Sequence, residues 1–129
     1  MREILFKGMR VDDSVFVEGF VFVGSERTVW IHPANESAIY YVKPDTVGEF
    51  SGVLDKTEKY IFEGDLVTAN LPGTVSQQPF SWGICEVIFK DGCFGLQTSR
   101  EFIPFWSFAP TVEFEVVGNI HDKKEQNND

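Results

Sequence analysis

Apolar residues recur along the chain at the two-residue spacing of β-strands, and the spacing typical of helices is absent. No stretch of ten or more residues carries apolar side chains at positions i, i+3, i+4 and i+7. β-Branched and aromatic residues instead form short runs that end at Gly, Pro, Asp or Ser. We therefore predict an all-β (mostly β) barrel or sandwich of eight or nine short strands. The clearest are residues 2–10, 15–23, 27–32, 38–42, 66–69 and 113–120.

One predicted strand, residues 15–23, is apolar on both faces, and only Glu18 and Gly19 interrupt the run. Such a strand is expected to be covered on both sides. The alternative is that one side is covered within the chain and the other packs against a neighbouring subunit. Both interpretations require that something lies over each face of this strand.

Two segments lack a clear strand pattern. Residues 46–64 are the least regular part of the chain, and the run from Asp55 to Glu58 predicts an exposed turn. Residues 70–81 contain three residues that break regular structure and predict a surface loop. These are Pro72, Gly73 and Pro79.

A hairpin over residues 82–96 is the strongest local prediction, because Asp91-Gly92 favours a two-residue turn with positive φ. The apolar residues that this turn brings together should form one face, directed towards the core. Cys85 and Cys93 are not opposite each other in this register, so no disulfide is expected between them. The predicted pairs are Phe89 with Phe94, Val87 with Leu96, and Cys85 with Thr98.

Composition and charge narrow the range of partners. The 129 residues fit one domain with at most a small subdomain, and 15% of them are aromatic, including 13 Phe. The net charge of −9 repels phosphate backbones, so direct nucleic-acid binding is not expected. The same charge leaves open a second function, in which the chain mimics DNA and acts as an acidic decoy for a DNA-binding protein.

The sequence also bears on localisation. No apolar run is long enough to cross a membrane and no secretory signal precedes the first strand, so we expect a cytoplasmic protein with reduced cysteines.

Residues able to carry catalysis are few and form no recognised motif. His32 and His121 have no partner in a catalytic motif. Solvated strand faces and polar turns are the simplest interpretation of the acidic pairs, so no enzyme, cofactor or metal is expected. A small metal-dependent or hydrolytic enzyme is kept as an alternative, because paired carboxylates can bind Mg²⁺ or act as acid and base. The pairs are Asp12 with Asp13, Glu63 with Asp65, and Glu113 with Glu115.

An aromatic segment, residues 102–108, is the best candidate for an interaction surface. Pro104 makes it a poor interior strand. Its rings either close the end of a barrel or remain exposed and bind a protein partner. The candidate contact residues are Phe102, Phe105, Trp106 and Phe108.

Several segments, in order along the chain, are similar to the YopX family of phage and prophage proteins. Residues 46–52 (TVGEFSG) and 61–67 (IFEGDLV) carry the strongest likeness, and Thr57-Glu58 departs from the Asn-Gly that often stands there in the family. The remaining similar segments are 2–8 (REILFKG), 54–56 (LDK) and 115–121 (EVVGNIH).

The resemblance implies a β-rich fold with an SH3-like barrel over residues 48–121. An N-terminal β-strand region, residues 1–47, would pack on the barrel, and residues 122–129 would form a frayed polar tail. Gly64 tolerates a strained turn, and the Asp65 carboxylate can accept backbone N–H groups that fix the next strand. The residues assigned a structural role are Gly48, Gly52, Glu63, Gly64, Asp65, Gly118 and Asn119.

The resemblance supplies phage or prophage origin but no activity. We therefore expect a non-enzymatic accessory protein of the bacterial host cytoplasm that acts as a protein-interaction module. Its partner is either an unidentified protein of the host or phage, or a second copy of the chain in a homo-oligomer.

Overall fold

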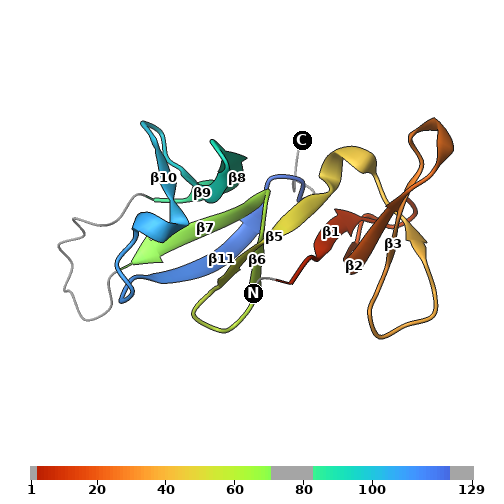
Figure 1. Ribbon diagram of the computed structural model, residues 1–129, viewed down its shortest axis with the longest axis horizontal. Helices are drawn as coiled ribbons and strands as arrows, with labels where there is room; N and C mark the ends of the chain where they lie inside the picture. Colours follow the sequence, from red (N-terminus) through yellow and green to blue (C-terminus); the bar gives the residue numbers. More distant parts are fainter. Residues whose placement is uncertain (1–2, 71–82, 123–129) are drawn as a thin grey trace, which may run out of the picture. The chain divides into compact units, whose positions relative to one another are not determined.

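The computed structural model describes residues 3–70 and 83–122, which divide into two compact units, Met1–Gly52 and Val53–Asp129 (Figure 1). Every strand pair is antiparallel, and the described residues contain no α-helix. The prediction of an all-β fold is therefore confirmed. Among the described residues, no helix is long and apolar enough to cross a membrane.

The first unit is built on a meander of four strands followed by β5. Their hydrogen-bonding order is β4-β3-β2-β1-β5. β5 runs across the division between the units, and β6 (Tyr60–Phe62) follows it in the order. The bounds are β1 Phe6–Met9, β2 Phe16–Val23, β3 Val29–His32, β4 Tyr40–Tyr41 and β5 Gly48–Leu54.

The four strands β1 to β4 curl round on themselves. An antiparallel bridge joins Arg10, just after β1, to Val42, just after β4. On the inner face, Ile31 and Val42 are almost fully buried. A Cβ atom at Gly8 would lie 3.2 Å from both of these side chains, so only glycine fits here without displacing them. At these positions the inner face is filled by residues of this unit.

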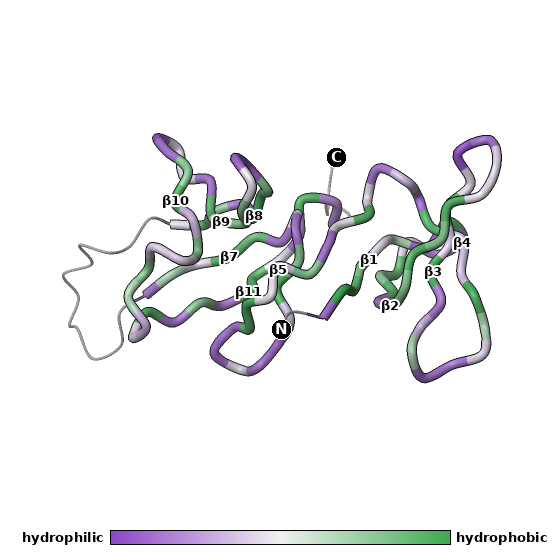
Figure 2. Tube along the Cα trace, in the orientation of Figure 1, coloured by the Kyte–Doolittle hydropathy of each residue, from purple (hydrophilic) through white to green (hydrophobic). Residues whose placement is uncertain are grey.

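The outer face of the meander is covered at β1. The short 3₁₀ helix η2 (Pro44–Thr46) lies against this strand, and the Met9 backbone N–H donates to Thr46 Oγ1 over 2.9 Å. Another 3₁₀ turn, η1 (Ser25–Arg27), joins β2 to β3. Polar residues gather in the two connections of β3 (Figure 2).

The second unit contains a five-stranded sheet with the order β10-β9-β8-β7-β11. Its core consists of Ile61, Val67, Ala69, Cys85, Val87 and Leu96. β10 and β11 are the two edges of the sheet, so closure into an SH3-like barrel is not part of this strand order. The bounds are β7 Asp65–Asn70, β8 Cys85–Lys90, β9 Cys93–Gln97, β10 Phe102–Pro104, the 3₁₀ helix η3 Phe105–Ser107 and β11 Glu113–Asn119.

The predicted hairpin has the register expected from its turn. Phe89 pairs with Phe94 and Val87 pairs with Leu96, while the β8–β9 pairing begins at Glu86 and Gln97 rather than at Cys85 and Thr98. Val87 and Leu96 are fully buried, but Phe89 is 53% exposed. The prediction that all of these residues face the core is therefore wrong for Phe89. Its ring contacts Phe94 edge-on at 4.8 Å near the hairpin tip.

Three strands were not expected from the sequence. The region predicted to be irregular, 46–64, holds β5 and β6, because β5 pairs with the distant β1 rather than with a neighbour in sequence. β10 is a short edge strand, which accommodates Pro104.

Two further predictions concern a turn and the parts of the chain without strands. Asp55, expected in an exposed turn, is only 6% exposed. Apart from Asn70 and Asp122, the predicted loop 70–81 and tail 122–129 lie outside the described residues.

Candidate interaction surfaces

The aromatic segment after β9 is split between core and surface. Phe105 and Phe108 pack against the hydrophobic core, and both contact the Phe114 ring edge-on, at 5.1 and 5.2 Å. Phe102 is half-buried, with Lys90 Nζ 5.9 Å from its ring centre. Trp106, in η3, is 77% exposed. Of the four candidate contact residues, only Trp106 therefore offers most of its side chain to a partner.

A larger aromatic surface lies on the outer face of the first unit. Cross-strand pairing places Phe22 opposite Trp30, and Trp30 opposite Tyr41, so the three rings lie in line across β2, β3 and β4. Phe20 lies two residues before Phe22 and therefore on the same face. We call these four residues, Phe20, Phe22, Trp30 and Tyr41, the outer row.

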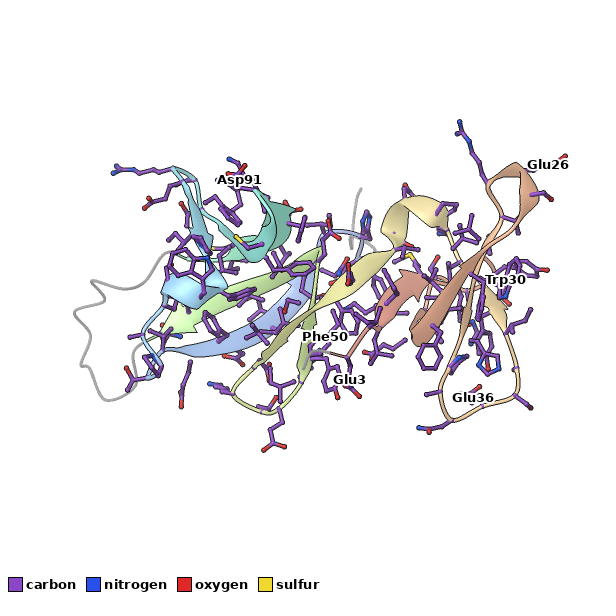
Figure 3. The ribbon with its side chains drawn as sticks, viewed as in Figure 1. Glu3, Glu26, Trp30, Glu36, Phe50 and Asp91 are labelled. Atoms are coloured by element: carbon purple, nitrogen blue, oxygen red, sulfur yellow. The ribbon has the colours of Figure 1, made fainter. Side chains whose placement is uncertain are left out.

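Three rings of the outer row contact one another, and three of the four are about half exposed. Phe22 stacks on Trp30 with centroids 6.0 Å apart, and Trp30 meets Tyr41 edge-on at 6.0 Å. Phe20 and Phe22 are each 47% exposed and Tyr41 is 53% exposed. Figure 3 labels Trp30 on β3, with Glu26 in the turn before this strand and Glu36 in the loop after it. Both glutamates are exposed.

A pocket of about 250 Å³ opens beside Tyr41, at the end of the outer row. Inside it, the Arg10 guanidinium lies over the Tyr40 ring at 4.4 Å. The Tyr40 hydroxyl donates to Glu36 Oε1 over 2.7 Å, and this bond raises the pKa of Tyr40 above its ordinary value. The lining residues are Arg10, Val11, Asp12, Ile39, Tyr40 and Tyr41.

The acidic pairs lie in different parts of the chain. Asp12 and Asp13 approach Arg10 Nε at 3.5 and 3.3 Å. Glu115 pairs with Lys56 at 3.4 Å on the second unit, whereas Glu63 and Glu113 are exposed. Within residues 3–70 and 83–122, no group of three His, Cys, Asp or Glu side chains is positioned to hold a metal ion.

Asp65 joins the turn before β7 to the end of β11. It is fully buried, and its carboxylate accepts hydrogen bonds from the Phe62 backbone N–H at 2.8 Å and from Asn119 Nδ2 at 2.9 Å. Gly64, at φ +96°, lets the chain turn so that its carbonyl accepts from the Ile120 N–H. These contacts give Gly64, Asp65 and Asn119 structural positions in the second unit.

Asp55 holds the β5–β6 turn against β11. Its Oδ1 accepts from the backbone N–H groups of Thr57 and Lys59 and from Thr57 Oγ1, and its Oδ2 accepts from the Val116 N–H. Burial raises the pKa of Asp55, but these hydrogen bonds outweigh it and lower the pKa to about 2. Both oxygens of this carboxylate therefore accept hydrogen bonds from donors of the same unit.

The other glycines of the predicted structural set lie in or beside strands. Gly48 opens β5 and pairs with Lys7, and Gly52 adopts φ +91° within the same strand. Gly118 follows an irregularity in the β7–β11 pairing.

The histidines and cysteines are not brought together. His32 ends β3 opposite Phe20, whereas the His121 backbone N–H donates to Asn119 Oδ1 in the second unit. Neither Cys85 nor Cys93 forms a disulfide. Burial raises the pKa of the Cys85 thiol, which disfavours the reactive thiolate.

Sequence reasoning did not identify the outer row as a surface, although a signal was present. Residues 15–23 are apolar on both faces, and this pattern required a cover on each side. Ile31 is buried on the inner face, although Val23 at the end of β2 is 73% exposed there, whereas Phe20 and Phe22 on the outer face are each 47% exposed. The sequence could not choose between a cover from within the chain and one from a partner.

Comparison with known proteins identifies the family. No curated protein and no solved structure gives a significant match to the chain. The similarity of residues 46–52 and 61–67 to the YopX family is confirmed, whereas the similar opening segment, 2–8, lies outside the matched range. Residues 21–126 match the family described as YopX protein, and because this match spans most of the chain, the protein belongs to the YopX family.

Proposed function

We propose that this YopX-family member is a non-enzymatic, phage-type accessory protein of the bacterial cytoplasm that binds another protein through exposed aromatic side chains. The observation that carries the proposal is the outer row, in which three of the four rings are about half exposed and three rings contact one another in line. Aromatic rings are enriched at the centres of protein interfaces, and large exposed apolar surfaces mark such interfaces. Trp106 offers a second contact point on the other unit.

The carboxylates that are buried support a binding role rather than a catalytic one. Asp55 and Asp65 direct their oxygens to backbone or amide donors of the same unit. A general acid or base needs an oxygen that can reach a substrate proton. Since these oxygens are already engaged in holding turns and strands, their positions are explained by the fold.

We further propose that the second unit is an SH3-like barrel. The strand order β10-β9-β8-β7-β11 supports this. The strands β7 to β10 form a meander, and its first strand, β7, also pairs with the final strand of the unit, β11. The 3₁₀ helix η3 between β10 and β11 gives additional support, since small barrels of this kind turn into the last strand in the same way. Further pairing at the sheet edges would complete the closure.

Partner capture with paired variants tests the binding role. The tagged chain is incubated with lysate of a bacterial host, and retained proteins are compared between the natural chain, Phe22→Ser and Trp106→Ser. We expect at least one retained protein to be lost with one of these variants, while Glu63→Gln, at an exposed position that belongs to neither aromatic surface, retains it. A strict monomer in light scattering that retains no partner would refute the proposal.

A further inference from the structure

Resting on the proposed function, we propose that the outer row binds a cationic segment of a partner protein. Lys or Arg side chains of this segment lie over the rings, and one apolar side chain enters the pocket beside Tyr41. The proposal names the chemistry of the partner and the surface that it contacts. It is independent of Trp106 and of the second unit.

The shape of the surface favours an extended segment. Phe22, Trp30 and Tyr41 come from three neighbouring strands, so their rings cross the sheet in one line. η2 covers the neighbouring β1, but the rings over β2 and β4 are about half exposed. A partner chain lying across the strands meets several rings in succession.

The partner must be recognised through side chains, because the backbone groups of β4 are already engaged. On one side, Tyr40 and Tyr41 pair with β3, and the Val42 N–H donates to the Val29 carbonyl. On the other side, the Val11 N–H donates to the Tyr41 carbonyl and the Lys43 N–H to the Met9 carbonyl. Addition of a partner strand at this edge would have to break these bonds.

Charge favours a cation over a second copy of the chain. Residues 1–52 carry five Lys and Arg against eight Asp and Glu, a net charge of −3 within the total of −9. Two copies would bring like charges together, whereas a basic segment would be attracted. The same charge opposes single-stranded nucleic acid, which stacking on rings would otherwise favour.

Of the four cations in residues 3–52, three make contacts within this unit and Arg27 is exposed, whereas several acids are also exposed. Lys7 is only 8% exposed and lies 4.9 Å from the Phe16 ring centre. Arg10 faces Asp12 and Asp13, and Lys43 donates to Ser14 Oγ over 3.0 Å. Glu18, on the outer face between Phe16 and Phe20, is exposed, as are Glu26 and Glu36. Between residues 16 and 43, three exposed acids therefore stand against one exposed cation, Arg27, which favours a basic segment over an acidic one.

Nearby acidic side chains add to the attraction that aromatic rings have for cations. The face of an aromatic ring carries negative charge and attracts Lys and Arg. The unit uses this contact within its own fold, where Arg10 lies over Tyr40 at 4.4 Å and Lys7 over Phe16 at 4.9 Å. The rings of the outer row are of the same kind, and their exposed area leaves room for cations from outside.

The pocket provides an anchor at one end of the row. Its volume of about 250 Å³ is close to that of a single large side chain and below the usual range for small-molecule sites. Val11 and Ile39, 54% and 44% exposed, give it apolar walls. An apolar side chain would pack against the walls of the pocket, and basic residues on either side of it would lie near the exposed acids.

Tryptophan fluorescence tests the proposal on the full chain. In a Trp82→Phe/Trp106→Phe variant, Trp30 is the remaining tryptophan and reports on the outer row. The probes are short synthetic peptides of alternating Arg and Leu, with matched peptides in which Gln or Glu replaces Arg, and a single-stranded oligothymidine. We expect the Arg peptide to change the Trp30 emission and to bind at least about tenfold more tightly than the Gln peptide, with weaker binding at high salt.

Substitutions assign the binding to the surface. Phe22→Ser should weaken binding about threefold to tenfold, and Tyr41→Ser provides a second test if the first variant loses its fold. Val23→Ser is the matched control, because Val23 is 73% exposed but alternates to the other face of β2. Glu18→Gln should weaken the Arg peptide alone, whereas Glu63→Gln on the other unit should not.

Three results would overturn the proposal. Equal binding of the Arg and Gln peptides would remove the role of charge. Tighter binding of oligothymidine would assign the row to nucleic acid. A dimer that is lost in Phe22→Ser would assign it to a second copy. Partner capture that still depends on Trp106 after such a result would leave the proposed binding role intact, so the two failures are distinguishable.

Discussion

The two units distribute their apolar side chains in different ways. In the second unit, Val67, Val87 and Leu96 are fully buried in one cluster, with further rings packed around it. In the first unit, Ile31 and Val42 fill the inner face, whereas Phe20, Phe22 and Tyr41 stay about half exposed on the outer face. Apolar surface left in water costs about 25 cal/mol per Å². This difference is the reason that the proposed binding surface is placed on the first unit.

Removing a fully buried core side chain should have the largest effect on stability. Leu96→Ala is expected to lower the free energy of unfolding by about 3 kcal/mol, because it leaves a cavity in a fully buried cluster. Urea denaturation followed by circular dichroism measures the change. Leu54→Ala is the control, since Leu54 is 44% exposed and should cost less than about 1 kcal/mol. Equal costs at the two positions would contradict the packing described here.

The buried carboxylate before β7 comes next. Asp65→Ala should destabilise the protein by about 2 kcal/mol, because the Phe62 N–H and the Asn119 side-chain amide lose their acceptor in a buried site. A double-mutant cycle with Asn119→Ala measures the coupling between the two side chains. Strict additivity would show that the pair does not act together.

Acid should remove the contribution of Asp55. Its pKa is about 2 in the folded protein against 3.8 in the unfolded chain, so the folded state favours the charged form. The resulting stability, about 2 kcal/mol, is fully present above pH ~4 and is lost as the pH falls through 2. Unfolding free energies measured across this range should fall less steeply for Asp55→Asn than for the natural chain. Parallel pH profiles would contradict the assignment.

The smallest effect on stability is expected in the outer row. Phe22→Ala should change the free energy of unfolding by less than about 1 kcal/mol, because the ring is already 47% exposed. Phe62→Ala, at a fully buried position, should cost about 3 kcal/mol or more in the same assay. A large loss for Phe22→Ala would mean that the row stabilises the fold itself, and the contrast between the units would fail.

Local sequence patterns determined much of this protein. The Asp91-Gly92 turn fixed the pairing of Phe89 with Phe94 and of Val87 with Leu96, because a two-residue turn leaves one register. The alternation of apolar residues located most strands and the all-β class. The run of residues 15–23 predicted a cover on both faces of β2, but Phe20, Phe22 and Val23 are exposed in the structure.

Tertiary structure alone decided which rings face water. β5 became visible only through its pairing with β1, more than forty residues away along the chain, where Phe6 is opposite Glu49. Phe105 and Trp106 are neighbours in sequence, yet one packs on the core and the other is 77% exposed. The spacing of apolar residues along a strand shows which side chains share one of its faces. Whether that side meets core or solvent depends on how distant segments fold over it.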